Sequence, residues 1–457
     1  MIKINNSHQE TWRLAWPMIL TNISVPLMGA VDTAILGHLD SAIYLGAVAI
    51  GSSILTFIFW AFGFLRMGTT SLVARAIGRS DMDASRLLLL QSLLLAFILA
   101  ALLFTLQGSF IPLALDLIGA SPAVAALAES YCQIRIYSAP ATLMTFALVG
   151  WFIGQQNTRA PLLIIVSLNA LNIILDFIFI IGLEMNSDGA ALATVIAEYG
   201  GLLLGLGLTW KTIRPQLAGQ ERKRLYRALG RYHQYAELLQ VNRHLFVRTA
   251  SLLFTFAFFT AQGARQGDET LAANALLFQL LLLISYGLDG FAHAAEAMIG
   301  KAVGAKSHTD FIAACKSTSF WALLTALLFS TAFALFETYL LAFFTNIQAI
   351  IDIAQGYYVF IIALPIVSVW GYQLDGIFIG AGKTKAMQNT MLFSVFAVFI
   401  PIWWVLSDYD NLGLWLAFCA FMLSRGLLLG AVFLYFQYTK CWFDNSCGPV
   451  NPDETYL

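Results

Sequence analysis

Two aspartates inside apolar segments are the residues of this chain best suited to chemistry. Asp32 follows a stretch from Leu14 to Val31 that carries no charge, and Asp176 lies in a second apolar run. A charged aspartate at the centre of a membrane helix costs at least ~3 kcal/mol on insertion scales. Protonation, a charged partner or a water-filled cavity removes that cost, and each of these predicts a functional site.

Polar side chains accompany the aspartates at helical spacing. Asn169, Asn172 and Asp176 are spaced i, i+3 and i+7, which places them on one face of a helix. A polar face on an apolar helix must contact protein or water rather than lipid. The following apolar segment adds Thr194 and Glu198 at i and i+4. If these helices face the helix of the first aspartate, the groups form a hydrogen-bonded proton or cation site.

A structural role is the alternative for part of this set. Asp176 and its neighbouring asparagines would then hold helices together through hydrogen bonds. Glu198 would equally well pair with Arg135. We favour function for Asp176, because ionisable residues inside a membrane usually mark ion or substrate pathways.

Two prolines precede the first aspartate in the same segment. Pro17 and Pro26 each remove a backbone donor and kink a helix, so this helix can have bent and straight states. A titratable acid on a bendable helix has the components of a switch. A static kink, common in membrane helices, is the alternative.

The second half of the chain has its own polar residues within apolar segments. We expect Arg425 to neutralise a neighbouring acid such as Asp289. His293, Glu296 and Asp375 lie toward the ends of their segments, and we interpret them, with Asp289, as gate or helix-end contacts.

The composition is that of a membrane protein. The chain of 457 residues is 59% hydrophobic and 11% charged, whereas a soluble domain carries about 25% charged residues. The net charge of −1 predicts no nucleic-acid partner.

Twelve apolar runs are long enough to cross a membrane as helices. We therefore expect an all-α membrane protein with spans at about residues 14–37, 43–71, 87–115, 123–150, 160–183, 189–211, 242–263, 270–300, 313–340, 350–378, 386–407 and 411–438.

The connections between these spans divide by charge. One set receives nearly all Lys and Arg residues, among them Arg75, Arg86 and the basic connection from Lys211 to Arg248. The opposite set holds Arg265 and several acids. The positive-inside rule then places both termini in the cytoplasm.

The chain repeats itself with a shift of 226 residues. Residues 45–50, 75–78 and 153–159 return as 271–276, 301–304 and 379–385. Each half contains six helices, so the repeat is parallel, with a pseudo-two-fold axis along the membrane normal, and such repeats flank a central substrate path. Asp32 aligns with Phe258 and Asp176 with Ile402, so only the first half carries the acid pair.

The repeat predicts four parts. We expect an N-lobe of helices 1 to 6 in residues 1–212, a basic cytoplasmic linker in 213–240, a C-lobe of helices 7 to 12 in 241–440, and a cytoplasmic tail in 441–457.

Three motifs carry a resemblance to a known family. The run from Asp32 to Leu39, the run from Gly189 to Thr194, and Asp375-Gly376 followed by residues 379–382 resemble a multidrug and toxic compound extrusion (MATE) transporter. The resemblance covers nearly the whole chain and is greatest to the DinF (DNA-damage-inducible) type of bacterial protein.

The resemblance implies cation-coupled export of amphipathic, often cationic, drugs by alternating access of two lobes. It assigns the family's helix-1 aspartate to Asp32, its helix-5 pair to Asn172 and Asp176, its helix-6 threonine to Thr194 and its bending proline to Pro17. In DinF-like members, protonation of the helix-1 aspartate is thought to bend that helix and close the N-lobe cavity.

The chain departs from other members at two positions. Met28 stands where some members have a tyrosine one turn before the aspartate, and residues 248–259 lack the glutamate of sodium-coupled members. The second difference favours protons as the coupling ion.

We therefore expect a proton-driven drug antiporter in the bacterial cytoplasmic (inner) membrane. Its expected partners are small amphipathic or cationic drugs and membrane lipids, and we expect a monomer without a cofactor or a resident metal. Sodium bound at Asp32 and Asp176 is the alternative ion, since carboxylate and amide oxygens suit a hard cation. A flippase for lipids or lipid-linked precursors is a second alternative. An enzyme is not expected, because the sequence has no catalytic triad, metal cluster or phosphate-binding loop.

Overall fold

The computed structural model describes residues 2–37, 42–119, 121–214, 229 and 235–443. Within these ranges the chain is helical and contains no strand. Most of the predicted linker (213–240) and tail (441–457) lies outside the described residues.

The first half contains eight α-helices. Two of the predicted spans are broken, one at Phe62–Gly63 between α2 and α3, and one by a 3-10 turn at Ile136–Ser138 between α5 and α6. A π-helical turn, Phe177–Gly182, continues α7. The bounds are α1 Ile2–Gly37, α2 Ala42–Ala61, α3 Phe64–Gly78, α4 Met82–Ile118, α5 Pro122–Arg135, α6 Ala139–Gly154, α7 Arg159–Asp176 and α8 Asn186–Ile213.

The second half repeats this pattern in the order of its long helices. A π-helical turn, Ser394–Phe399, joins α14 to α15. The bounds are α10 Ala236–Ala264, α11 Asp268–Gly304, α12 His308–Phe344, α13 Gln348–Ala381, α14 Thr384–Phe393, α15 Ile400–Val405 and α16 Asp410–Tyr438.

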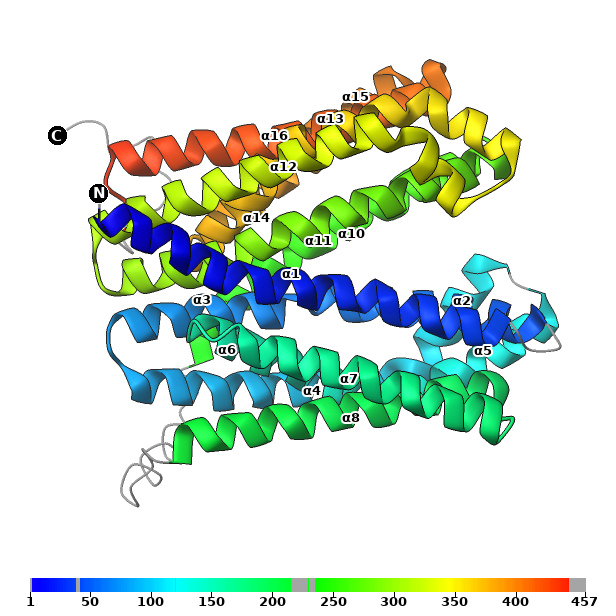
Figure 1. Ribbon diagram of the computed structural model, residues 1–457, viewed down its shortest axis with the longest axis horizontal. Coiled ribbons are helices and arrows are strands. Elements are labelled where there is room, and N and C mark those ends of the chain that lie inside the picture. The colour runs from blue at the N-terminus through cyan, green and yellow to red at the C-terminus, as the bar shows by residue number, and fades with distance from the viewer. Residues whose placement is uncertain (1, 38–41, 120, 215–228, 230–234, 444–457) are drawn as a thin grey trace.

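Eleven helical segments of the described chain are long and apolar enough to cross a membrane. The 36-residue α1 lies beside them and packs along α7 and α11 (Figure 1). The prediction of an all-helical membrane protein is therefore confirmed. Helix α1 begins at Ile2 rather than near residue 14, because hydroxyls on its first turns bond to α12: Ser7 and Thr11 each lie 2.9 Å from Ser317 Oγ.

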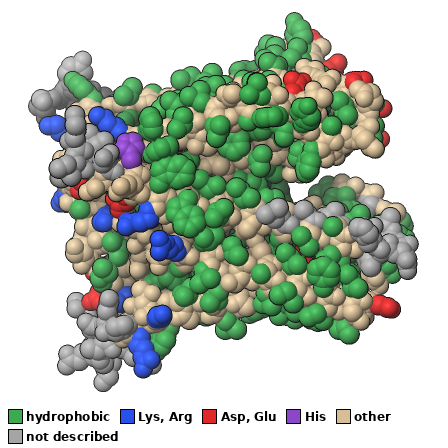
Figure 2. Space-filling model, viewed as in Figure 1, with side chains coloured by type: hydrophobic (Ala, Val, Ile, Leu, Met, Phe, Trp, Pro, Cys, Tyr) green, Lys and Arg blue, Asp and Glu red, His purple; other side chains and the backbone are tan. Residues whose placement is uncertain are grey.

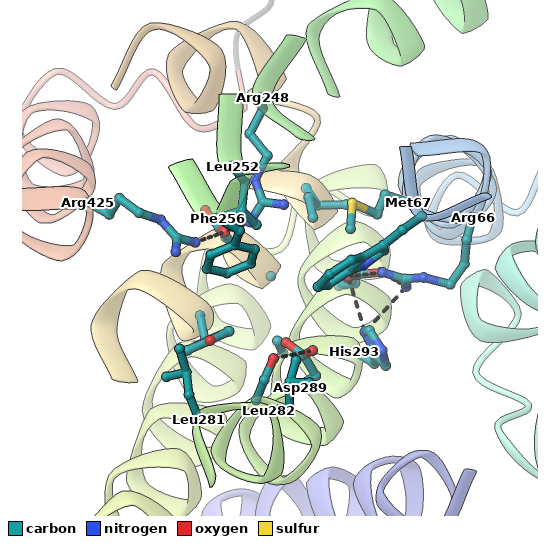
Figure 3. A pocket seen from close by; sticks show the side chains of 18 of the residues that line it. Arg66, Met67, Arg248, Leu252, Phe256, Leu281, Leu282, Asp289, His293 and Arg425 are labelled. Atoms are coloured by element: carbon teal, nitrogen blue, oxygen red, sulfur yellow. Dashed lines mark hydrogen bonds and ion pairs between the residues drawn. The ribbon is translucent and has the colours of Figure 1, made fainter. Parts of the chain in front are cut away.

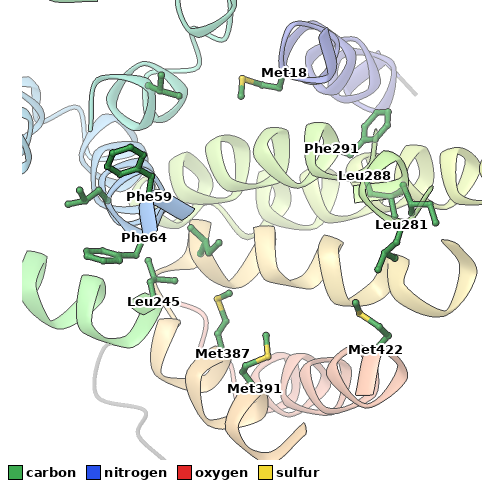
Figure 4. Packing of buried hydrophobic residues seen from close by; sticks show 14 of the residues in the cluster. Met18, Phe59, Phe64, Leu245, Leu281, Leu288, Phe291, Met387, Met391 and Met422 are labelled. Carbon is green, nitrogen blue, oxygen red and sulfur yellow. The ribbon is translucent and has the colours of Figure 1, made fainter. Parts of the chain in front are cut away.

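The two halves form two bundles that meet along α1, α3, α10 and α11 (Figure 1). Buried apolar side chains continue across the junction, where Phe64 of α3 lies beside Leu245 of α10 (Figure 4). Lys and Arg gather at the end that holds both termini. Asp and Glu gather at the other end, where a cleft separates the halves (Figure 2).

The contact between α3 and α11 has two-fold character. A Cβ added to Gly78 would overlap the carbonyl oxygen of Lys301, and one added to Gly304 would overlap that of Arg75. The two contacts are related by the shift of 226 residues seen in the sequence. Each half therefore presents the same surface to the other, as in an isologous interface.

The packing inside each half repeats in the same way. Gly150 of α6 approaches the carbonyl of Arg66, and Gly376 of α13 approaches that of Ala292. All four positions obey the same shift, so each lobe uses one helix-packing solution twice.

We predict that Gly304→Ala destabilises the protein by about 1–3 kcal/mol, because the added methyl must push apart the backbones of α3 and α11. Thermal unfolding of the purified protein in detergent measures this as a lower Tm. Gly108→Ala in α4 is the control, since nothing lies within 4 Å of its added Cβ. A Tm for Gly304→Ala equal to that of the control would contradict the close crossing.

Candidate functional site

The two predicted aspartates meet inside the first lobe. Helix α1 carries Asp32 and the last turn of α7 carries Asp176, which is fully buried. The two carboxyl groups are neighbours and interact directly. Among the described residues, neither oxygen of Asp176 nor Oδ1 of Asp32 has hydrogen-bond geometry to a partner.

An amide and a hydroxyl complete this group. Asn172 lies one turn before Asp176, and its Nδ2 donates to Thr194 Oγ1 of α8 at 3.3 Å. Thr194 in turn donates to the carbonyl of Ala190 at 2.8 Å. The oxygen of Asn172 is buried and has no hydrogen-bond partner in the described part of the chain. Several acceptor oxygens are thus collected in one place without donors.

Two residues of the predicted cluster have other partners. Asn169 Nδ2 donates to the carbonyl and the hydroxyl of Ser24 at 3.1 and 3.0 Å, and so ties α7 to α1. Glu198 pairs with Arg135 at 3.7 Å, which was the structural alternative for this acid. Arg135 also lies close enough to Asp32 to interact electrostatically. We call Asp32, Asn172, Asp176 and Thr194 the N-lobe acid cluster.

Both helix-1 prolines lie inside one continuous helix. Pro17 is buried and Pro26 is exposed, and the whole of α1 keeps helical geometry from Ile2 to Gly37. Thr21 Oγ1 donates to the carbonyl of Pro17 at 2.7 Å. Because each proline lacks an N–H, the turn before it has one main-chain hydrogen bond fewer.

A separate cavity of about 260 Å³ lies between the lobes. We call it the interlobe cavity (Figure 3). Trp60 of α2 and Phe256 of α10 stack across the junction with ring centroids 6.0 Å apart. The charged or titratable side chains that line it are Arg66, Arg248, Asp289, His293, Glu296, Asp375 and Arg425.

Asp375 is held by two arginines. Arg425 Nη2 donates to Asp375 Oδ2 at 2.8 Å, and Arg248 donates to the same oxygen. The predicted Arg425–Asp289 pair is therefore wrong, because Asp375 on the neighbouring helix α13 takes that arginine. Arg248 was assigned to the basic connection, but it is buried in α10 and faces the cavity.

Glu296 is also paired, and its partner comes from the other lobe. Arg66 of α3 donates to Glu296 Oε2 at 3.0 Å, and His293 Nδ1 lies 3.3 Å from Glu296 Oε1. The sequence analysis overlooked Arg66, although a lone base inside the predicted span 43–71 is itself an indication of an internal partner.

Asp289 differs from the other two acids of the cavity. Its oxygen accepts a hydrogen bond from Ser285 at 3.2 Å, and no ion pair to it occurs among the described residues. Arg66, Arg248 and His293 are near enough to act on it electrostatically without pairing. The gate or helix-end role predicted for His293, Glu296 and Asp375 stays a prediction.

A resident metal site is not visible in the described residues, where no group of three or more His, Cys, Asp or Glu side chains converges. The arrangement offers an ion-sized acid cluster in one lobe and an aromatic, charge-lined cavity between the lobes. Two repeated helical lobes around such a cavity define a membrane transporter rather than an enzyme.

Comparison with known proteins identifies the family. The family model MatE matches residues 17–178 and 245–405. DNA damage-inducible protein F of Escherichia coli (strain K12) is 41% identical over 97% of this chain and 95% of its own length. The chain therefore belongs to the MATE family of secondary transporters, as the motifs indicated, and it is a multi-pass membrane protein that exports drugs or toxic compounds.

Two further similarities are consistent with this family. The probable multidrug resistance protein NorM of Thermotoga maritima is 25% identical over 94% of this chain and 93% of its own length. A solved structure described as the outward-facing conformation of a multidrug resistance MATE family transporter has a TM-score of 0.82 at 20% identity, covering 96% of this chain and 97% of its own. The fold is thus that of solved MATE structures.

We predict that Asp375→Asn destabilises the protein by about 3–5 kcal/mol, because it leaves Arg248 and Arg425 buried without a counter-charge. Asp352→Asn is the control, since Asp352 is exposed at the start of α13 and its substitution should change stability by less than about 0.5 kcal/mol. Thermal unfolding in detergent compares the two. Equal Tm values for both variants would show that the arginines do not depend on Asp375.

Proposed function

We propose that the protein is a proton-coupled antiporter that exports amphipathic, often cationic, drugs, with the N-lobe acid cluster as its proton site. The observation that carries this proposal is the pair of neighbouring carboxyl groups of Asp32 and Asp176, whose oxygens lack hydrogen-bond donors in the described chain. Two negative charges this close in an apolar interior repel each other, and a bound cation removes the repulsion.

The coupling cycle uses this repulsion. Protons that enter from outside neutralise the acid cluster, and a cationic drug held by its negative charge is then released. One charge crossing 100 mV yields about 2.3 kcal/mol, and each pH unit of gradient adds about 1.4 kcal/mol. Either source is large enough to shift a drug equilibrium more than tenfold.

The second lobe supports a proton rather than a sodium site. The only acid in α10 is Glu237 at its start, and Asp375 already binds two arginines. Sodium remains the alternative at Asp32 and Asp176, because Asn172 and Thr194 add the oxygens that a hard cation prefers.

The remaining expectations enter the proposal with it. The two lobes, residues 1–212 and 241–440, would rock about the crossing of α3 and α11. The basic end of the molecule, which holds both termini, would face the cytoplasm. The transporter would act as a monomer.

We predict that Asp32→Asn abolishes proton-coupled drug efflux. Vesicles carrying the variant are loaded with a fluorescent cationic drug, and efflux and proton movement are followed after a pH jump. Asp268→Asn, which alters an exposed acid at the start of α11, should keep both activities. Undiminished coupled efflux by Asp32→Asn would overturn the proposal. Efflux that follows a sodium gradient after the pH gradient has been collapsed would instead establish the sodium alternative.

The bend of helix α1 is tested separately. Spin labels at exposed Val25 of α1 and Phe320 of α12 report the position of α1 at low and at high pH. We predict that the pH-dependent change in their distance disappears in Pro17→Ala, because the alanine N–H closes the missing main-chain bond.

Pro112→Ala is the control for this experiment, since Pro112 lies inside α4. That variant should keep the pH-dependent change in distance. A Pro17→Ala variant whose α1 responds to pH as the wild type does would refute the bending step.

A further inference from the structure

The charges of the interlobe cavity are not evenly balanced, and their imbalance points to a ligand. Glu296 is neutralised by Arg66 of the opposite lobe. The group of Asp375, Arg248 and Arg425 contains two positive charges and one negative charge. It therefore has one positive charge in excess.

Asp289 provides the opposite excess. It lines the same cavity, and among the described residues it has no ion-pair partner, only the hydroxyl of Ser285. A carboxylate that is withdrawn from water without a counter-charge costs several kcal/mol. The cavity thus has a negative wall at Asp289 on α11 and a positive wall at Arg248 and Arg425 on α10 and α16 (Figure 3).

The positive wall also has unused hydrogen-bond donors. The Nε atoms of Arg248 and Arg425 are buried and have no acceptor among the described residues. The Arg425 guanidinium lies over the ring of Tyr372 at 5.8 Å, which fixes its plane. A planar acceptor group such as a carboxylate is the natural partner for such donors.

Aromatic rings fill the space between the two walls. Phe256 contacts Phe278 with ring centroids 5.8 Å apart, and Trp60 stacks on Phe256 from the other lobe. Such walls favour a flat apolar body, through burial and through stacking. The cavity of about 260 Å³ is close to the lower end of the size usual for small-molecule sites.

We propose that the interlobe cavity binds the zwitterionic members of the amphipathic substrates, with the ammonium group at Asp289 and the carboxylate at Arg248 and Arg425. This proposal rests on the proposed export function and names a substrate class and a site separate from the N-lobe acid cluster. Asp289 and Arg248 are then specificity-determining residues, because each removes the cost of one charge of the ligand.

A matched pair of dyes tests the proposal. An unesterified rhodamine carries a cationic xanthene body and a free carboxylate, whereas its methyl ester carries only the cation. Binding of each dye to the purified protein in detergent at neutral pH, without any ion gradient, is measured by fluorescence anisotropy. The wild type should bind the zwitterion about tenfold more tightly than the ester, a difference of about 1.4 kcal/mol.

Substitutions assign the two walls. Asp289→Asn should weaken both dyes about tenfold, since both carry the cation. Arg248→Gln removes the excess positive charge and should weaken only the zwitterion, so that the preference between the dyes disappears. Equal binding of both dyes by the wild type, or unchanged binding by Asp289→Asn, would overturn the proposal.

Two further measurements separate this result from other failures. Size-exclusion chromatography and Tm show whether each variant is folded, and retained binding of the ester shows that Arg248→Gln keeps a working cavity. The dye experiment uses no proton gradient, so loss of dye preference leaves the Asp32 efflux result unaffected. Conversely, a failed proton-coupling test would leave the dye preference standing.

Discussion

The cost of placing a charge in an apolar interior determines the organisation of this protein. Arginines in the middle of the bundle exist because acids on other helices neutralise them: Arg66 with Glu296, Arg135 with Glu198, and Arg248 with Asp375. Within the described chain, two places depart from this pairing. Asp32 and Asp176 face each other as like charges, and Asp289 stands in a cavity without an ion-pair partner.

These departures coincide with the places where an external charge would be useful. A proton at the first place and a ligand ammonium at the second would each complete a pairing that the chain itself leaves open. The transporter would then work by exchanging counter-charges, while the paired arginines keep the helices in register.

The repeat explains why these sites are not duplicated. The backbone crossings are symmetric, as Gly78 and Gly304 show. The side chains within each lobe are not. Phe258 stands at the position equivalent to Asp32, and its ring packs on Trp403 at 4.8 Å and on Phe399 at 5.6 Å. The second lobe thus fills with aromatic rings the volume that the first lobe gives to an acid cluster.

The sequence predicted the fold well because its strongest constraints are one-dimensional. The length of apolar runs, the distribution of Lys and Arg, and the shift of 226 residues do not depend on side-chain contacts. Helical periodicity also placed Asn172 and Asp176 on one face, which the structure bears out.

Partner choice between helices was beyond the sequence. Asn169 bonds to Ser24, and Arg425 takes Asp375 rather than Asp289. Which acid an arginine reaches depends on the rotation and crossing of α11, α13 and α16, and spacing along one helix does not encode these. Arg248 was misassigned for a related reason, since its position near a basic connection hid its burial.

The central claim is that the N-lobe acid cluster exchanges protons for a cationic drug. The most direct measurement is proton release from the purified protein in weakly buffered detergent solution when a cationic drug is added. The wild type should release protons in proportion to the drug bound, and the Asp32→Asn/Asp176→Asn double variant should release none while remaining folded. Equal proton release by the double variant, or drug binding by the wild type without any release, would contradict the account.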